Sequence, residues 1–338
     1  MNDFEHTPHE PEQNISIAPE NMGAPDPGSP RTGLRPWGGD LASETWDSTA
    51  HTEEPAELFQ SFSQPEVIPP ARIPHLGHLA LLSAFLLLGF VCMMVLMAVA
   101  LHFHLDGVST SDQIKTNIHY LLGTEAVLYL VALALSIPLF SLLWNKSFFV
   151  GIHWRGATAL GLGWRLPVIS VGCFALALLN DALFPGPEHA PIVDMFRSPG
   201  AAWLMFGFGV TFAPFFEEVV FRGFLLPALA TAWDWAIEKF MGRPARPLHA
   251  NGHPQWSIFA MVIASIPTSI LFALLHTEQQ GNSLSLFLLF VAISMILCAV
   301  RLVTRSLAAS TLVHACYNFL IFFSMMVSTG GFRHLDKM

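Results

Sequence analysis

Long apolar runs dominate the chain from Leu79 onward and restrict its architecture more than any other feature. The first run, Leu79–Leu101, has 23 residues and no charged side chain. At 1.5 Å per residue, such a helix crosses a hydrocarbon core of about 30 Å. Because backbone groups in lipid must be satisfied within the protein, α-helices are the expected spanning elements. Six similar runs follow, at Tyr120–Trp144, Leu166–Phe184, Ala201–Trp233, Trp256–Leu275, Ser283–Val300 and Ser306–Val327.

The number of spans depends on the longest run. Ala201–Trp233 has 33 residues and contains Pro214, and a proline inside a helix removes a backbone hydrogen bond and kinks or breaks it. This run is therefore one long tilted helix or two shorter helices that meet near the proline. The chain is 53% hydrophobic and 12% charged, with a mean hydropathy of +0.50. We predict an all-α, polytopic membrane helix bundle of about seven or eight transmembrane helices.

The N-terminal segment has a different composition. Residues 1–73 contain 13 Asp and Glu against three Lys and Arg, and residues 1–70 contain 11 of the 24 prolines. With few apolar side chains, this segment cannot bury enough surface to offset the entropy of ordering. We predict a disordered, acidic, proline-rich tail that carries most of the formal net charge of −9.

The distribution of charge excludes one class of partner and suggests an orientation. The chain has no basic patch typical of nucleic-acid binding, and no strong dinucleotide or phosphate-loop motif. Lys and Arg near span ends tend to remain cytoplasmic, and here they gather in alternate connections. We therefore expect a multi-pass integral protein of the plasma or inner membrane if the host is bacterial, with a cytoplasmic tail; Arg333 and Lys337 count against this orientation. The bases are Lys146, Arg155 and Arg165, then Lys239, Arg243 and Arg246, then Arg301 and Arg305.

Two adjacent carboxylates and an arginine lie inside the fourth apolar run. Ionisable groups in a membrane span cost a few kcal/mol each, so a chain that retains several generally uses them. On an α-helix Glu218 and Arg222 are four residues apart on one face and can form an ion pair. Glu217 points about 100° away and remains free to act.

Two histidines occur in later spans. His276 ends the fifth run, and the seventh contains His314 and Asn318, which lie four apart on one helical face and could hold a single oxygen atom or ion. Together with Glu217, these side chains could supply a general base, donors to an oxyanion, or metal ligands. A single polar residue in a span often serves only to hold neighbouring helices together, whereas this set on three helices indicates a functional cavity.

These motifs resemble those of the CPBP intramembrane proteases, a family that includes type II CAAX prenyl endopeptidases and Abi or bacteriocin-related proteins. Its members carry a double glutamate followed by an arginine, then Phe-x-x-x-His, then His-x-x-x-Asn or Asp. The resemblance covers about residues 200–325 and extends weakly to the lead-in Thr304-Arg305-Ser306-Leu307. The matching residues are Glu217, Glu218 and Arg222, then Phe272 and His276, then His314 and Asn318.

The resemblance implies a peptidase with a cavity in the membrane. Glu217 and His276 would activate a water, His314 and Asn318 would stabilise the oxyanion, and Glu218 with Arg222 would orient the site. The partners would be membrane lipid and a peptide or protein substrate, with or without an attached lipid. The family is commonly called a metalloprotease, and Glu217, His276 and His314 could bind Zn²⁺ or work without a metal.

Four regions follow from these patterns. We predict the tail at 1–73, N-terminal transmembrane helices at 74–199, a CAAX-protease-like catalytic helix bundle at 200–327, and a short C-terminal tail at 328–338. The candidate site residues do not fall at one depth with these boundaries. His276 lies near the outer end of its span, and His314 lies about eight residues from the inner end of its own. To meet, either the fifth span extends through 277–280 or helices tilt and break around the cavity.

Two other functions fit the same residues. A proton-coupled transporter could use the glutamates and histidines as a relay, with Glu125 and Asp181 as further stations. Against it, the sequence shows no internal repeat and no paired broken helices. A noncatalytic immunity or scaffold protein would use the polar set only to fix helix packing. Neither the physiological substrate nor the oligomeric state follows from the sequence.

Overall fold

The computed structural model describes residues 72–184, 196, 198–249, 253–277 and 281–335. All of them belong to one compact unit, Ile68–Met338. The predicted disordered tail lies outside the described residues, apart from Arg72 and Ile73. Ile73 is buried in the core, and the Arg72 guanidinium pairs with the Glu238 carboxylate at 2.8 Å, so the folded unit begins slightly before the predicted boundary.

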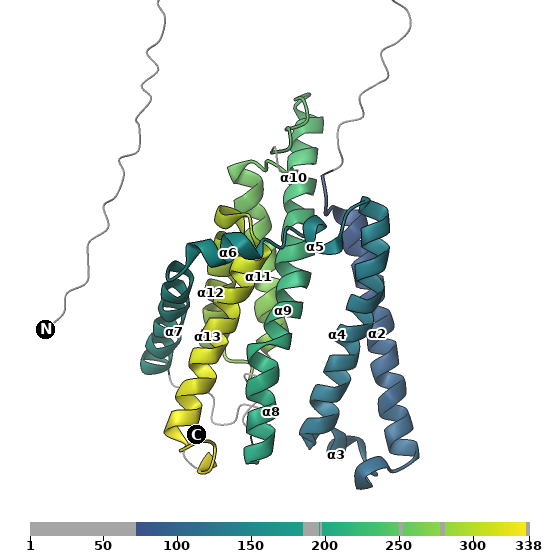
Figure 1. The fold of residues 1–338 in the computed structure, drawn as a ribbon, viewed down its shortest axis with the longest axis vertical. Coiled ribbons are helices and arrows are strands. Elements are labelled where there is room, and N and C mark those ends of the chain that lie inside the picture. Colours follow the sequence, from purple (N-terminus) through teal and green to yellow (C-terminus); the bar gives the residue numbers. More distant parts are fainter. Residues whose placement is uncertain (1–71, 185–195, 197, 250–252, 278–280, 336–338) are drawn as a thin grey trace, which may run out of the picture. The chain divides into compact units, whose positions relative to one another are not determined.

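The described residues form a bundle of helices (Figure 1), as predicted. Seven helices in the described part of the chain are long and apolar enough to cross a membrane. Each predicted span coincides with one of them, and most ends differ by one to four residues. The elements are α2 (Leu76–His102), η1 (Leu105–Gly107), α3 (Ser111–Thr116), α4 (Ile118–Trp144), α5 (Phe148–Gly151), α6 (Gly156–Leu162), α7 (Arg165–Leu183), α8 (Pro199–Val210), α9 (Phe212–Glu218), η3 (Val219–Leu225), α10 (Leu226–Phe240), α11 (Ile258–Thr277), α12 (Leu284–Thr304) and α13 (Leu307–Ser328).

The fourth span is one long helical segment that changes geometry twice. It runs from Pro199 to Phe240 over 42 residues and is longer than a membrane crossing requires. The first change is at Thr211, between α8 and α9, three residues before Pro214. A proline removes the bond to the carbonyl four residues earlier and clashes with it, which explains a break at this place. The second change is η3, a turn of π-helix that begins directly after Glu218.

The helices pack in pairs that surround the long segment. α2 packs along α4, α11 along α12, and α7 along α13, while α8, α9 and η3 contact α13 (Figure 1). An aromatic cluster of α4, α5 and η3 joins the first pair to the long segment, through Phe140, Trp144, Phe148 and Phe224. The fourth span therefore contacts helices from both halves of the sequence.

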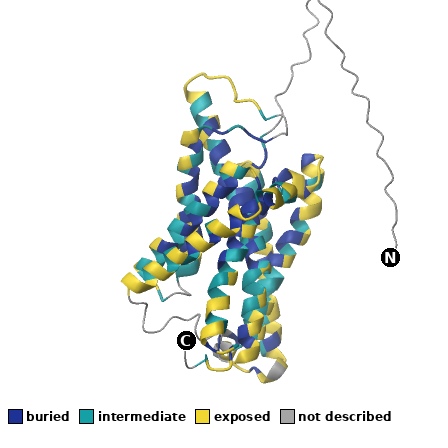
Figure 2. Ribbon diagram, turned by 60° about the vertical axis from the view of Figure 1, so that its left-hand side comes forward, coloured by how far each residue is buried: buried dark blue, intermediate teal, exposed yellow. Residues whose placement is uncertain are grey.

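Exposed residues lie along the outer faces of the spanning helices (Figure 2), and many of them have large apolar side chains. On α2 they include Leu87, Val95 and Leu96, all about half exposed or more. A water-soluble surface rarely carries contiguous apolar area of this extent, whereas lipid-facing helices require it. The protein is therefore a multi-pass integral membrane protein in contact with lipid. Which side its N-terminus occupies stays a prediction.

The basic connections meet at one end of the bundle, in agreement with the alternation in the sequence. His153, between α5 and α6, is influenced by the charges of Lys146, Arg155 and Arg301. One base differs from its predicted place. Arg301 was expected in a connection after the sixth span, but it lies inside α12 and only 1% of it is exposed. The predicted C-terminal tail is also partly packed, since Phe332 is fully buried against Trp203 and Phe206.

Candidate active site

The two adjacent glutamates end α9, and the π-turn η3 follows them. Glu218 is fully buried, whereas the Glu217 side chain is 18% exposed. The two carboxylates point to different surroundings, as the helical geometry predicted. Single π-turns inside longer helices occur frequently at functional sites, because the wider turn shifts the side chains that follow it. Here the shift affects Arg222, in the middle of η3.

Glu218 and Arg222 form the predicted ion pair. Nη1 of Arg222 donates to Oε1 of Glu218 at 2.9 Å, and both side chains are fully buried. Nη2 of Arg222 donates to Oγ of Ser294 on α12 at 2.6 Å and to the Ser294 carbonyl at 3.2 Å. The ring of Phe272 on α11 lies 4.7 Å from the guanidinium carbon, within the range of a cation–π contact. The arginine therefore joins α11 and α12 to the long segment.

The same oxygen of Glu218 also holds His314 of α13. Nδ1 of His314 lies 3.1 Å from Oε1 of Glu218. A carboxylate paired with arginine has no proton to give, so the histidine donates from Nδ1. This fixes the ring and directs Nε2 the other way, toward Glu217. Glu218 is thus a structural link between Arg222 and His314, and it does not face the cavity.

His276, near the end of α11, is oriented by its own helix. Its Nδ1 lies 2.8 Å from the carbonyl oxygen of Phe272, one turn earlier, and a carbonyl can only accept. Nδ1 therefore carries the proton, and in the neutral ring Nε2 is left as an acceptor. The ring also stacks on Phe290 of α12, with centroids 5.1 Å apart. Phe272 serves the site twice, since its carbonyl orients His276 and its ring supports Arg222.

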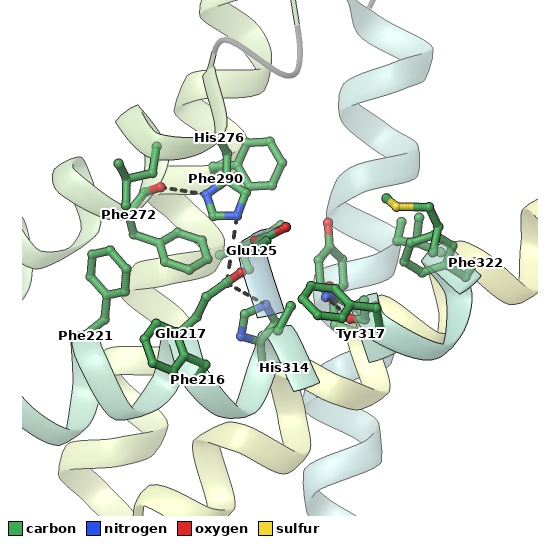
Figure 3. Close-up of a pocket in the computed structure, with 18 of the residues that line it drawn as sticks. Glu125, Phe216, Glu217, Phe221, Phe272, His276, Phe290, His314, Tyr317 and Phe322 are labelled. Carbon is green, nitrogen blue, oxygen red and sulfur yellow. Dashed lines mark hydrogen bonds and ion pairs between the residues drawn. The ribbon is translucent and has the colours of Figure 1, made fainter. Parts of the chain in front are cut away.

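Glu217 lies between the two histidines (Figure 3). Its Oε2 is 3.8 Å from Nε2 of His276 and 3.8 Å from Nε2 of His314. These gaps exceed hydrogen-bond length, but one water placed beside the carboxylate can bond to it and to an imidazole. The structure brings the three side chains together although the sequence predicts different depths for them. α11 ends at Thr277 in the described part of the chain, and residues 278–280 lie outside it.

Asn318 lies one turn after His314 on α13 and lines the same cavity. Its Nδ2 donates to the carbonyl of Gly209 on α8 at 2.8 Å. This bond uses one of the two N–H groups of the amide, so a second donor remains. A side chain at position 209 would collide with the ring of Phe322, 2.7 Å from an ideal Cβ, which accounts for a glycine beside Asn318.

The start of α13 is set by the lead-in motif. Ser306 caps the helix, because its Oγ accepts from the backbone N–H of Ala309 at 3.3 Å. The same hydroxyl donates to the carbonyl of Arg155 at 2.9 Å and so fixes the helix start to the segment before α6. Arg305 adopts a left-handed conformation that ends α12. The motif therefore sets the position of α13, and with it that of His314.

A cavity of about 610 Å³ adjoins these residues. Its lining comes from α2, α4, α7, α8, α9, η3, α11, α12 and α13 and is mainly aliphatic and aromatic. The polar groups that reach it include Glu217, His276, His314 and Asn318. Glu125 of α4 also faces it and accepts a hydrogen bond from Tyr129, whose ring stacks on Phe216. The apolar lining includes Leu86, Leu121, Leu128, Phe208, Val220, Leu289, Ile293 and Ile321.

Glu217, His276 and His314 are potential metal ligands. Carboxylate and imidazole groups suit zinc, and both histidines have partners on Nδ1 of the kind that orient metal ligands. In the part of the chain that the structure describes, however, no group of three or more His, Cys, Asp or Glu side chains is placed to hold a metal ion. Metal binding by Glu217, His276 and His314 stays a prediction.

Sequence reasoning missed two residues that contact this network. Ser294 binds the Arg222 side chain, and Nε of Arg301 donates to the Arg222 carbonyl at 3.2 Å. A serine in an apolar helix carries no distinctive signal. Arg301 did give one, as a charge inside an apolar run, but it was assigned to the connection after that run.

Comparisons with known proteins agree with this geometry. Residues 199–320 match a family model described as type II CAAX prenyl endopeptidase Rce1-like. This segment contains all six candidate site residues and spans α8 to most of α13. No curated protein and no solved structure matches the chain. The matched segment, about a third of the chain, is the one that carries the suspected CPBP motifs, and this part of the protein is similar to the Rce1-like type II CAAX prenyl endopeptidases.

Proposed function

We propose that the protein hydrolyses a peptide bond of a lipidated, CAAX-type membrane peptide with a water activated by Glu217 and His276. The observation that carries the proposal is the position of Glu217 between two imidazole nitrogens at the wall of an apolar cavity. A carboxylate beside neutral imidazole can take a proton from water in a site that excludes bulk solvent. The largely apolar lining suits a substrate that carries a hydrocarbon chain.

The proposed reaction conserves protons. A water held by Glu217 and Nε2 of His276 gives one proton to Glu217, while its oxygen attacks the carbonyl carbon of the scissile bond. The carbonyl oxygen becomes an oxyanion. Glu217 then returns the proton to the amide nitrogen, the carbon–nitrogen bond breaks, and a carboxyl group and an amine are released.

The oxyanion would be stabilised by two donors on one face of α13. The free N–H of Asn318 is one, and Nε2–H of His314 is the other when the ring carries both protons. The Glu218 carboxylate accepts from Nδ1 of the same ring. A single donor of this kind contributes about 10²–10³ in rate in a known oxyanion site.

The test is cleavage of quenched-fluorescent peptides by the purified full-length protein in detergent. Matched peptides would end in Cys-a-a-X with and without a farnesyl thioether. The variants are Glu217→Gln and, as a matched carboxylate control, Asp181→Asn, which lines the same cavity from α7. We expect cleavage of the farnesylated peptide by the wild type and Asp181→Asn, and none by Glu217→Gln.

Two further arms decide between the alternatives. Activity that survives a zinc chelator supports the metal-independent reaction, and activity lost in chelator and restored by zinc contradicts it. Equal cleavage of both peptides would contradict the lipidated substrate. Cleavage by Glu217→Gln at the wild-type rate, or none by any folded protein, would overturn the proposed function in favour of a relay or a scaffold.

A further inference from the structure

Two buried side chains of α12 hold both ends of one arginine on the neighbouring segment. Ser294 and Arg301 are seven residues apart, two turns of an α-helix, so they project from the same face. Ser294 is fully buried and Arg301 is 1% exposed. Both contact Arg222, which lies in the π-turn η3.

The two residues contact different parts of Arg222. Ser294 accepts from Nη2 of the Arg222 side chain, through its hydroxyl at 2.6 Å and its carbonyl at 3.2 Å. Arg301 donates from Nε to the backbone carbonyl of Arg222 at 3.2 Å. One contact fixes where the guanidinium points, and the other fixes the backbone from which it starts.

The orientation of the Arg222 guanidinium affects the site through a continuous series of hydrogen bonds. Arg222 holds Glu218 at 2.9 Å, and the same Glu218 oxygen accepts from Nδ1 of His314 at 3.1 Å. Nε2 of His314 then faces Glu217 at 3.8 Å. A displaced guanidinium would release Glu218, and the His314 ring would lose the hydrogen bond that orients it.

The burial of Arg301 shows that it has a specific role. A buried charge costs several kcal/mol unless it is well paired. Among the described residues, no carboxylate lies within ion-pair distance of Arg301, and its Nη2 has no hydrogen-bond partner. Its contacts are the Arg222 carbonyl and Nε2 of His253 at 3.3 Å. A buried charge without an ion-pair partner adds little net stability. The group that Arg301 holds is the backbone of Arg222, which is part of the site.

We propose that Ser294 and Arg301 are positioning residues of the active site, which act through Arg222 and Glu218 to hold His314 with its proton on Nδ1 and its Nε2 toward the cavity. The assignment of an effect on turnover rests on the proposed function. The orientation of His314 does not, and it can be measured separately.

The kinetic experiment compares matched pairs with the peptide assay above, per mole of monodisperse folded protein. Ser294→Ala is paired with Ser265→Ala, a buried serine of α11 that donates to its own helix at Met261. We expect Ser294→Ala to lower kcat about tenfold with KM within about twofold, because a small misplacement in a site costs rate rather than binding. Ser294→Thr retains the hydroxyl and restores kcat to within about threefold, and Ser265→Ala matches the wild type.

Arg301→Lys is paired with Arg305→Lys, an exposed arginine at the end of the same helix. Lysine keeps the charge but cannot reproduce the fixed fork of the guanidinium. We expect a fall in kcat for Arg301→Lys and none for Arg305→Lys. Wild-type kcat in both Ser294→Ala and Arg301→Lys, with Glu217→Gln inactive, would overturn the positioning role and leave the proposed function intact.

The second measurement needs no activity. ¹⁵N NMR of histidine-labelled protein in detergent reports which ring nitrogen carries the proton, and a His314→Gln spectrum assigns the signal. We expect the Nδ1–H form of His314 to predominate in the wild type and to decrease in Ser294→Ala and Arg301→Lys. An unchanged His314 signal in both variants would contradict the inference even if no peptide is cleaved.

Discussion

Oε2 of Glu217 lies 3.8 Å from Nε2 of His276, and the two side chains come from the ends of two different helices, α9 and α11. The histidine is fixed by the carbonyl of Phe272, and the glutamate by the end of α9 before the π-turn. The two side chains can therefore share a water without a direct bond. Because both groups act on one water, the loss of either should remove the same catalytic step.

The first prediction follows from that cooperation. Glu217→Gln and His276→Gln should each lower kcat/KM by about 10²–10⁴, the usual contribution of a general base. The kcat/KM of the double variant should lie within about threefold of that of the less active single variant, because the effects of residues that act as a unit are non-additive. The measurement is initial rate with the farnesylated peptide. Losses that multiply in the double variant would show that the two residues act in separate steps.

The second prediction concerns the buried ion pair. Glu218→Leu leaves the Arg222 charge without its carboxylate, and breaking such a pair costs about 3–5 kcal/mol. We expect a lower thermal unfolding midpoint in detergent, by tryptophan fluorescence. The double variant Glu218→Leu/Arg222→Met removes both charges and should regain much of the midpoint while remaining inactive. A double variant less stable than Glu218→Leu would contradict this account.

The sequence predicted the elements well because each span carries its own signal. Twenty apolar residues in a row specify a membrane helix regardless of its neighbours, and Pro214 specifies a break within a few residues. The ion pair of Glu218 with Arg222 was also predictable, from helical spacing alone. Local patterns therefore gave the helices and one contact of the candidate site.

The remaining contacts depend on how separate helices meet. No periodicity indicates that Ser294 lies against Arg222, or that Asn318 donates to the carbonyl of Gly209. The π-turn also has no sequence signature, although it sets the place of Arg222. Arg301 was misplaced for a related reason, because a charge near a span end has the same pattern whether it is solvated or buried by a neighbouring segment.

The third prediction concerns a close approach in the aromatic cluster. A Cβ on Gly151 would collide with the ring of Trp144, which is itself buried in the aromatic cluster. Gly151→Ala should therefore destabilise the protein by about 1–3 kcal/mol, as overpacked cores do. Gly161→Ala is the matched control, because its Cβ would meet nothing within 4 Å. Equal unfolding midpoints for the two variants would contradict the packing described here.

The fourth prediction is a dependence of stability on pH that arises at the basic end of the bundle. Burial, and then the charge of Arg301, lowers the pKa of His153 to about 2 and that of His253 to about 3, from an ordinary value of 6.5. Below about pH 6.5 the unfolded chain binds protons that these folded rings do not. Stability is therefore fully present above that pH and falls as the pH is lowered, by about 2 kcal/mol for each ring at pH 5.

A single substitution isolates one of the two rings. His153 has a left-handed backbone, with φ of 60°, and asparagine tolerates that conformation without titrating. His153→Asn should therefore reduce the fall in unfolding midpoint between pH 7 and pH 5 relative to the wild type, while other titrating groups contribute equally to both. The measurement is thermal unfolding in one detergent at pH 5, 6, 7 and 8. Parallel curves for the two proteins would show that His153 is protonated equally in the folded and unfolded states, contrary to its burial beside Arg301.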